Sequence, residues 1–209
     1  MEFKDLEFTI ISGAPKSSVD FIKENVDRDT FIIAADAGYL YCIKAGIKPD
    51  LIIGDFDSAK RPAFHCDIIT LPQEKDDTDT FACVKEACKR GAQRIEIYAA
   101  IGSRLDHTLA NIMCLEYCRE RNVTAFIINE KNKAFIETSD FSILKNEKKY
   151  FSLFSLTENS EISISGAKYN IEHARLDFAS SLGVSNEILD DAADIKIHSG
   201  KLLVILSND

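Results

Sequence analysis

The fold is decided by residues 31–57, whose sequence is FIIAADAGYLYCIKAGIKPDLIIGDFD. It begins with one apolar run, 31–35, and ends just after a second, 51–53; both have the length of a buried strand. The segment between them, 39–45, has a helical pattern and is followed by Gly46, a residue type common just after a helix. A strand, a helix and another strand in this order are typical of a parallel sheet.

The same alternation continues on both sides of this segment. Further buried strands are predicted at residues 8–11, 68–69, 95–98 and 125–128. Helices are predicted at 17–25, capped by Ser17 or Ser18, at 80–90 and at 105–121. Apolar strands separated by helices imply a parallel sheet that is covered on both faces.

The pattern changes between Asn129 and Lys133, after which the helical period disappears. Alternating segments then predict antiparallel strands of a small sandwich, at residues 134–137, 150–153, 162–165, 195–197 and 202–205. We therefore expect two domains: an α/β parallel-sheet domain over residues 1–130 and an all-β antiparallel sandwich over residues 131–209.

Composition excludes several classes of protein. Of the 209 residues, 45% are hydrophobic and 28% charged, as in an ordinary globular protein. The formal net charge of -9 argues against a nucleic-acid binder, which needs Lys and Arg to displace counterions. The six cysteines form no C-x-x-C pair. Without a signal-peptide pattern or a run of about 18 apolar residues, we expect a cytoplasmic protein with no membrane contact.

Acidic residues follow one predicted strand after another. In chain order they are Asp36, then Asp55 and Asp57, then Asp76, Asp77 and Asp79, and finally Asp106. The carboxyl ends of parallel strands lie along one edge, where ligands bind. Gathered carboxylates attract a hard cation such as Mg²⁺, which usually brings substrate phosphates with it. Lys75 and Arg104 would reach the same edge, so the pattern favours phosphoryl chemistry.

Simpler roles compete for some of these residues. Asp77 or Thr78 is expected to cap the following helix, with Asp77 favoured, and Asp106 could be a first-turn residue that favours the helix dipole. A single D-x-D occurs often by chance. The sequence has no G-x-x-x-x-G-K-[ST], no G-x-G-x-x-G and no G-x-S-x-G, which disfavours the corresponding nucleotide and hydrolase sites.

Taken together, these motifs resemble the thiamine pyrophosphokinase (thiamine diphosphokinase) family. The matching stretches run along nearly the whole chain: residues 35–38 (ADAG), 46–58 (GIKPDLIIGDFDS), 74–79 (EKDDTD), 102–111 (GSRLDHTLAN) and 183–187 (GVSNE). The resemblance implies transfer of the β,γ-diphosphate of ATP to the hydroxyl of thiamine, giving thiamine diphosphate and AMP. It also implies a catalytic α/β domain, a thiamine-binding sandwich and a homodimer with thiamine between the α/β domain of one subunit and the sandwich of the other.

The resemblance also implies roles for single residues. Asp55, Asp57 and Asp79 correspond to metal ligands for Mg²⁺. Asp36, Lys75, Arg104 and His107 are assigned to the nucleotide, and Ser185 and Asn186 to thiamine. Asp76, Asp106 and Arg104 are the catalytic candidates, with Asp76 or Asp106 orienting the hydroxyl and accepting its proton while Lys75 and Arg104 offset charge.

Two departures from the family's pattern stand out. Ala37 replaces the first glycine of a usual Gly-Gly pair, a small change if its φ is negative. The chain also has no Trp, although some members stack a Trp on thiamine. A Tyr, Phe or apolar residue of the sandwich would replace it. Two other functions stay open: a metal-dependent phosphohydrolase that gives the diphosphate to water, and a nonenzymatic sensor of thiamine or nucleotide.

Overall fold

The structure is a computed structural model that describes residues 6–56, 66–72, 74, 76–145 and 148–209. The chain divides into two compact units, Met1–Glu130 and Lys131–Asp209. In the part that the structure describes, no helix combines the length and apolar character needed to span a bilayer.

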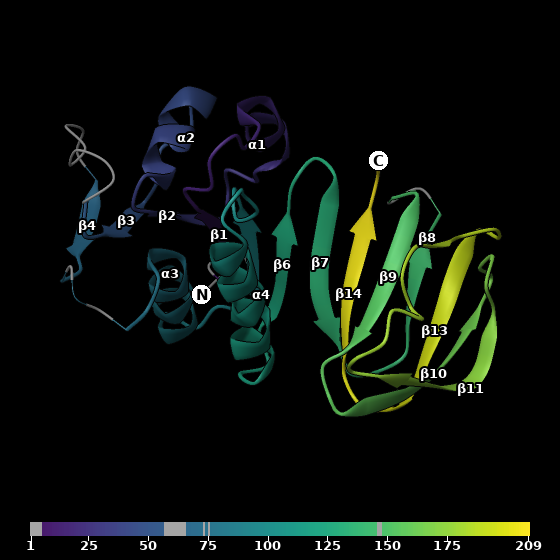
Figure 1. The fold of residues 1–209 in the computed structure, drawn as a ribbon. Coiled ribbons are helices and arrows are strands. Elements are labelled where there is room, and N and C mark those ends of the chain that lie inside the picture. The colour runs from purple at the N-terminus through teal and green to yellow at the C-terminus, as the bar shows by residue number, and fades with distance from the viewer. Residues whose placement is uncertain (1–5, 57–65, 73, 75, 146–147) are drawn as a thin grey trace. The chain divides into compact units, whose positions relative to one another are not determined.

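The first unit is built on a parallel sheet (Figure 1). Its strand order is β6-β5-β1-β2-β3-β4, so the chain starts near the middle and crosses to both sides. The strands are β1 (Glu7–Ile11), β2 (Phe31–Ala35), β3 (Leu51–Gly54), β4 (Asp67–Thr70), β5 (Arg94–Tyr98) and β6 (Thr124–Ile128). All the pairings are parallel, as expected from the apolar runs, and every carboxyl end therefore points to the same edge.

Four helices in the described residues cover the two faces of this sheet. They are α1 (Val19–Asn25), α2 (Gly38–Ala45), α3 (Asp79–Lys89) and α4 (Leu105–Arg119). Helices α1 and α2 lie together on one face, and α3 and α4 lie together on the other (Figure 1). Ser18 caps α1 by accepting from the backbone N–H of Phe21 at 3.2 Å, and Gly46 ends α2 with φ 65.

The core of this unit forms between the sheet and the helices. One cluster packs Ile11, Ala34 and Ile52 from neighbouring strands against Ile22 of α1 and Cys42 of α2, each at most 1% exposed. The strands are apolar at nearly every position because both of their faces are covered. Burial of this kind fixes the strand ends, and with them the side chains that follow each strand.

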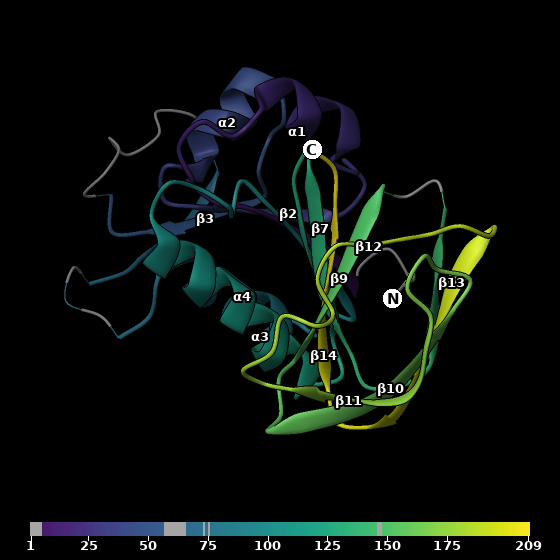
Figure 2. The same cartoon turned by 45° about the vertical axis from the view of Figure 1, so that its right-hand side comes forward.

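The second unit consists of antiparallel strands in two layers (Figure 1, Figure 2). One layer has the order β12-β9-β14-β7 and the other the order β11-β10-β13-β8. The strands are β7 (Asn132–Glu137), β8 (Phe141–Leu144), β9 (Tyr150–Ser155), β10 (Asn159–Ser165), β11 (Ile171–Asp177), β12 (Asn186–Glu187), β13 (Ala192–Ser199) and β14 (Leu202–Ser207). The fold class predicted from the sequence, a parallel α/β part followed by an antiparallel sandwich, is confirmed.

Strands β8, β11 and β12 were not expected from the sequence pattern. The pairing of β10 with β11 shifts register between Ile162 and Ile164, and His173 inside β11 has φ 47. A bulge of this kind interrupts the two-residue period by which a strand is found in a sequence. Strand β12 has only two residues, which is too short to give a pattern.

Candidate functional site

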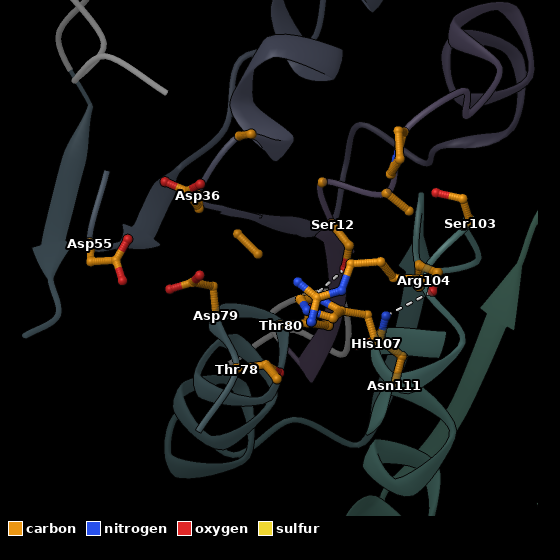
Figure 3. A pocket seen from close by; sticks show the side chains of 17 residues that line it. Ser12, Asp36, Asp55, Thr78, Asp79, Thr80, Ser103, Arg104, His107 and Asn111 are labelled. Carbon is orange, nitrogen blue, oxygen red and sulfur yellow. Dashed lines mark hydrogen bonds between the residues drawn. The ribbon is translucent and has the colours of Figure 1, made fainter. Parts of the chain in front are cut away.

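A cleft of about 490 Å³ lies at the carboxyl edge of the parallel sheet. It is lined from the ends of β1, β2, β3 and β5 and from the first turns of α3 and α4 (Figure 3). Its lining residues are Ser12–Pro15, Ala35–Ala37, Asp55, Thr78–Thr80, Ala100, Gly102–Arg104, His107 and Asn111. The cleft lies where ligands bind in open parallel sheets.

Three carboxylates gather at one end of this cleft. Asp36 follows β2, Asp55 follows β3, and Asp79 is the first residue of α3 (Figure 3). The Asp36 side chain is buried, whereas Asp55 and Asp79 are partly exposed. Negative charge collected in this way suits a cation or a cation-bound phosphate.

Backbone geometry holds Asp36 in place. Asp36 has φ 40, a conformation that is uncommon outside glycine, and its N–H donates to the Ile53 carbonyl at 2.8 Å. A Cβ built on Gly54 would lie 2.8 Å from the Asp36 Cα, so only glycine allows β3 to pass this close. Ala37 has φ -59, which meets the condition under which alanine can replace the usual glycine there.

A cation, the Arg104 guanidinium, lies at the other end of the cleft, where the chain enters α4. Arg104 is the N-cap residue of α4, and His107 and Asn111 lie on the following turns (Figure 3). Arg104 donates to Asp106 through Nη2 at 2.6 Å and Nε at 3.2 Å. This pairing lowers the pKa of Asp106 to about 2, with a further contribution from the N–H of His107 and against some desolvation. Both side chains are well exposed, so Arg104 can turn toward an anion.

Hydrogen bonds fix the floor of the cleft. The hydroxyls of Ser12 and Thr80 lie 2.9 Å apart and are buried, which joins β1 to α3. The Asn111 side chain donates to the Ala100 carbonyl at 2.7 Å and joins α4 to the loop after β5. Thr78 caps α3 by accepting from the Phe81 N–H at 3.2 Å.

The expectation that Asp77 caps α3 is wrong. Its carboxylate lies 2.6 Å from the Lys85 ammonium, two turns along the helix. The Thr78 hydroxyl already accepts from the Phe81 N–H as the cap, which leaves Asp77 available for this ion pair. Thr78, the alternative weighed from the sequence, is the cap.

The described residues suit a hard cation by their chemistry. Asp55 and Asp79 supply oxygen ligands, and Mg²⁺ typically takes one or two carboxylates and completes its shell with water and phosphate. Within residues 6–56, 66–72, 74, 76–145 and 148–209, no three His, Cys, Asp or Glu side chains are close enough to form a complete metal site. A cation that arrives with phosphate oxygens needs no such preformed set.

A second hollow, of about 300 Å³, lies within the antiparallel unit. Apolar side chains of β10 and β11 line it, together with Tyr169, Leu182 and Val184 from the loops. Tyr169 is 61% exposed, which is unusual for an aromatic ring beside an apolar hollow. The hollow has the size and lining of a site for a small ring system.

Asn186 holds the backbone that carries Tyr169. Its side chain donates to the Tyr169 carbonyl at 2.9 Å and accepts from the Tyr169 N–H at 3.0 Å. It also accepts from the N–H of Glu187 at 2.9 Å, and it is only 6% exposed. Ser185, next to it, is exposed, has φ 60 and donates its N–H to the Ser152 hydroxyl at 3.0 Å.

The structure brings together some of the residues predicted from the sequence. Asp36, Asp55, Asp79, Arg104 and His107 all line the cleft of the first unit. Asp76 and Asp106 do not line it: both are exposed, and Asp106 pairs with Arg104. Two predicted residues, Asp57 and Lys75, lie outside the described part of the chain.

Sequence reasoning missed one side of the cleft. Residues Ser12–Pro15 follow β1 and line it, as do Thr80 and Ser103. The site was predicted from charged residues, so this loop of small, neutral residues was not included. The rule that every strand end meets the same edge would have included the loop after β1.

Comparisons with known proteins agree with this arrangement. Residues 22–127 match the thiamin pyrophosphokinase catalytic domain, and residues 138–203 match the thiamin pyrophosphokinase vitamin B1 binding domain. The chain is 29% identical to thiamine pyrophosphokinase of Bacillus subtilis (strain 168), over 96% of this chain and 98% of that protein.

Solved structures show the same fold. The crystal structure of thiamine pyrophosphokinase from Bacillus subtilis has a TM-score of 0.86 at 28% identity, covering 97% of this chain and 99% of the other. The structure of a thiamin pyrophosphokinase family protein from Enterococcus faecalis has a TM-score of 0.83 at 25% identity, covering 97% and 99% of the two chains.

Proposed function

The chain belongs to the thiamin pyrophosphokinase family, and from this premise we propose that it transfers the β,γ-diphosphate of ATP to the hydroxyl of thiamine. The products are thiamine diphosphate and AMP. The observation that carries the proposal is the cleft itself, which places carboxylates at one end and Arg104 with His107 at the other. A diphosphate carried by a cation fits between two ends of opposite charge.

The carboxylate end receives the metal-bound phosphates. Asp55 and Asp79, with Asp57 outside the described residues, are the proposed ligands of Mg²⁺. Bound there, Mg²⁺ neutralises charge on the phosphate oxygens. Asp36, whose side chain is buried, lines the same end of the cleft.

The end of the cleft that carries Arg104 is proposed to bind the nucleotide and its β,γ-diphosphate. Arg104 forms a bidentate pair with Asp106, and the same planar fork matches phosphate oxygens. His107 lies on the next turn and lines the cleft, and Lys75 is the other proposed phosphate contact. In-line attack by the thiamine hydroxyl on the β-phosphorus then breaks the bond to the AMP oxygen.

Asp76 or Asp106 is the proposed acceptor of the hydroxyl proton. Both are exposed, Asp76 in the segment before α3 and Asp106 in the first turn of α4, so an incoming acceptor can reach them. A loose transition state needs little help from a base, because the proton leaves late. A carboxylate with a low pKa, such as Asp106, is sufficient for orientation and for late proton transfer.

Thiamine is proposed to bind at the hollow of the sandwich. Tyr169 offers an exposed aromatic ring and is the proposed replacement for the Trp that some family members stack on thiamine; Leu182 and Val184 line the same hollow. Ser185 is exposed and can contact the ligand directly. The Asn186 side chain is hydrogen bonded to the backbone N–H and carbonyl of Tyr169, so its proposed role is to position the Tyr169 ring.

The proposed active form is a homodimer, in which the sandwich of one subunit meets the α/β unit of the other. Exposed apolar residues in each unit support this. Leu105, Leu109 and Met113 form one stripe along α4, beside the cationic end of the cleft. Tyr169 and Leu182 are similarly exposed at the hollow. A second copy would remove both surfaces from water.

One incubation tests this function. The full chain is mixed with ATP, Mg²⁺ and thiamine, and the products are followed by mass spectrometry. We expect AMP and thiamine diphosphate in equal amounts, and no AMP when thiamine is left out. ATP turnover that is undiminished without thiamine would identify a phosphohydrolase instead. Binding of thiamine with no turnover would identify a sensor.

A further inference from the structure

Four of the six cysteines lie where α3 packs against α4. Cys83 and Cys88 belong to α3, and Cys114 and Cys118 belong to α4. The two helices lie side by side on one face of the sheet (Figure 1, Figure 2). Each helix leads into a strand of the same parallel sheet, so both run in one direction, beginning at the cleft edge and ending at the opposite edge.

Cys88 and Cys118 occupy equivalent places on the two helices. Each is the last residue but one of its helix, and each lies six residues before one member of a register pair, Arg94 in β5 and Thr124 in β6. Cys88 is partly exposed, whereas Cys118 is buried. A partly exposed thiol therefore lies beside a buried one at the same end of the two packed helices, and neither lines the cleft.

The surroundings distinguish the two sulfurs. The hydrogen bond from Cys118 lowers the pKa of the Cys88 thiol against the effect of its burial, and the nearby Arg121 cation lowers it further. The same hydrogen bond, with burial, raises the pKa of Cys118. The Arg121 guanidinium is held at the end of α4, 3.5 Å from the centre of the Tyr117 ring. Cys88 is also the thiol of this pair that a reagent in solvent can reach, so it is the nucleophile.

The other thiols lack these features. Cys83 and Cys114 are fully buried at the same helix interface, and burial raises the pKa of both. Cys66 is partly exposed, but its thiol donates to the Pro49 carbonyl at 3.2 Å, and burial raises its pKa. Cys66 therefore serves as an internal comparison for Cys88, since both can be reached by solvent.

We propose that Cys88 and Cys118 form a modification site, a peroxide-reactive thiol pair that oxidises to a disulfide joining the ends of α3 and α4. The Cys88 sulfur attacks one oxygen of hydrogen peroxide, so an S–O bond forms while the O–O bond breaks. The departing hydroxide takes a proton and becomes water. Cys118 then attacks the sulfenic sulfur, gives up its proton, and a second water leaves as the S–S bond forms. One peroxide thus accepts two electrons from two thiols.

Peptide mapping tests the proposal on the full-length chain. The protein is reduced, freed of reductant, treated with hydrogen peroxide, alkylated and digested with trypsin. Cleavage at Lys and Arg releases Cys88 in residues 86–89, while residues 105–119 contain both Cys114 and Cys118. We expect these two peptides to be linked, and a Cys114→Ala variant to keep the link, which assigns it to Cys118. Reduction should restore both free thiols.

Matched variants decide the outcome. Cys88→Ser should abolish the link, and Cys66→Ser should leave it intact. In Cys118→Ala, the sulfenic acid at Cys88 has no partner and should be trapped by a 1,3-diketone reagent. Oxidation of Cys66 at lower peroxide than Cys88, or a disulfide between any other two cysteines, would overturn the proposal. The readout needs neither ATP nor thiamine, so it is independent of the proposed function.

Discussion

Strained single residues mark the ends of several strands in this protein. Asp36, Phe56 and Ala99 follow β2, β3 and β5 with φ of 40, 58 and 51. Ser185, just before β12, has φ 60. Each such conformation costs about 1 to 3 kcal/mol outside glycine and persists only where packing imposes it. Asp36 lines the cleft, and Ser185 lies between Val184 and Asn186, which line the hollow, so two of these residues lie at the candidate sites.

Replacement of Asp55 should reduce activity more than replacement of Asp106. Asp55→Ala should lower kcat/KM roughly 100-fold or more, because a lost metal ligand removes several kcal/mol of charge neutralisation. Asp106→Ala should cost less, since a loose transition state makes small demands on a base. Formation of AMP and thiamine diphosphate measures both, with circular dichroism as the control for folding. An equal or larger loss at Asp106 would contradict this order.

The second prediction concerns pH. Arg104 holds the pKa of Asp106 at about 2, below its usual 3.8. Because the pKa is lowered, the carboxylate stays charged, and its pairing with Arg104 is lost only as the pH falls through about 2. Asp106→Asn should therefore lower kcat/KM by the same factor at every pH above about 4, leaving the shape of the profile unchanged. A displaced acid limb in the variant would show that Asp106 titrates in that range.

At the scale of helices and strands, the close approach of β3 to the turn after β2 is decisive. Gly54→Ala would place a Cβ 2.8 Å from the Asp36 Cα. We expect the unfolding free energy to fall by about 1 to 3 kcal/mol from overpacking, with a loss of activity as Asp36 moves. Urea denaturation measures the first effect and product formation the second.

Gly13→Ala is the matched control for stability. A Cβ at Gly13 would meet its nearest atom at 3.5 Å, an ordinary contact, so this change should leave the unfolding free energy within about 1 kcal/mol of the unmodified chain. If the two glycine variants unfolded at the same urea concentration, the tight approach at Gly54 would have no energetic importance.

Asn186 holds the loop before β11 through its hydrogen bonds to Tyr169 and also bonds to Glu187. Asn186→Ala removes three hydrogen bonds that hold Tyr169 and Glu187, so the KM for thiamine should rise about tenfold while the KM for ATP stays constant. In a Tyr169→Ala background the same change should have little further effect, because Asn186 acts through Tyr169. Independent, multiplying effects on KM would instead indicate direct contact of Asn186 with thiamine.

Much of this architecture could be predicted from the sequence because burial leaves a clear pattern. Apolar runs such as 31–35 and 51–53 located β2 and β3, and the acidic residues after them located the cleft. Strand β11 was missed because its bulge at His173 breaks the alternation. The hydrogen bonds of Asn186 to the backbone of Tyr169 could not be predicted, because the sequence does not distinguish an Asn that bonds to backbone from one that binds a ligand.

At the scale of the whole molecule, each of the two compact units has its own buried residues. Ile33, Ile53 and Ile97 are fully or almost fully buried in the first, and Phe151 and Leu153 are fully buried in the second. The proposed phosphate contacts fall in the first unit, and the proposed thiamine contacts in the second. A complete active site then requires both units.

Mixing two impaired variants tests whether each active site uses units from one subunit or from two. Asp55→Ala disables the first unit and Tyr169→Ala weakens the second. If each site uses units from different subunits, every mixed dimer contains one intact site and one doubly altered site. An equal mixture, unfolded and refolded together, should therefore recover about one quarter of the unmodified activity at low thiamine. Recovery no greater than the sum of the separate variants would place both halves of the site in one subunit or in a monomer.

The separate core of each unit has a consequence for how this enzyme could diversify. Tyr169 and Leu182 belong to the second unit, whereas the strand ends that hold Asp36 and Asp55 belong to the first. Evolution, or a laboratory selection, could therefore change the acceptor alcohol through substitutions in the second unit while the first unit keeps its sequence. The protein would keep its donor chemistry through that search, which is the condition for gradual change of substrate.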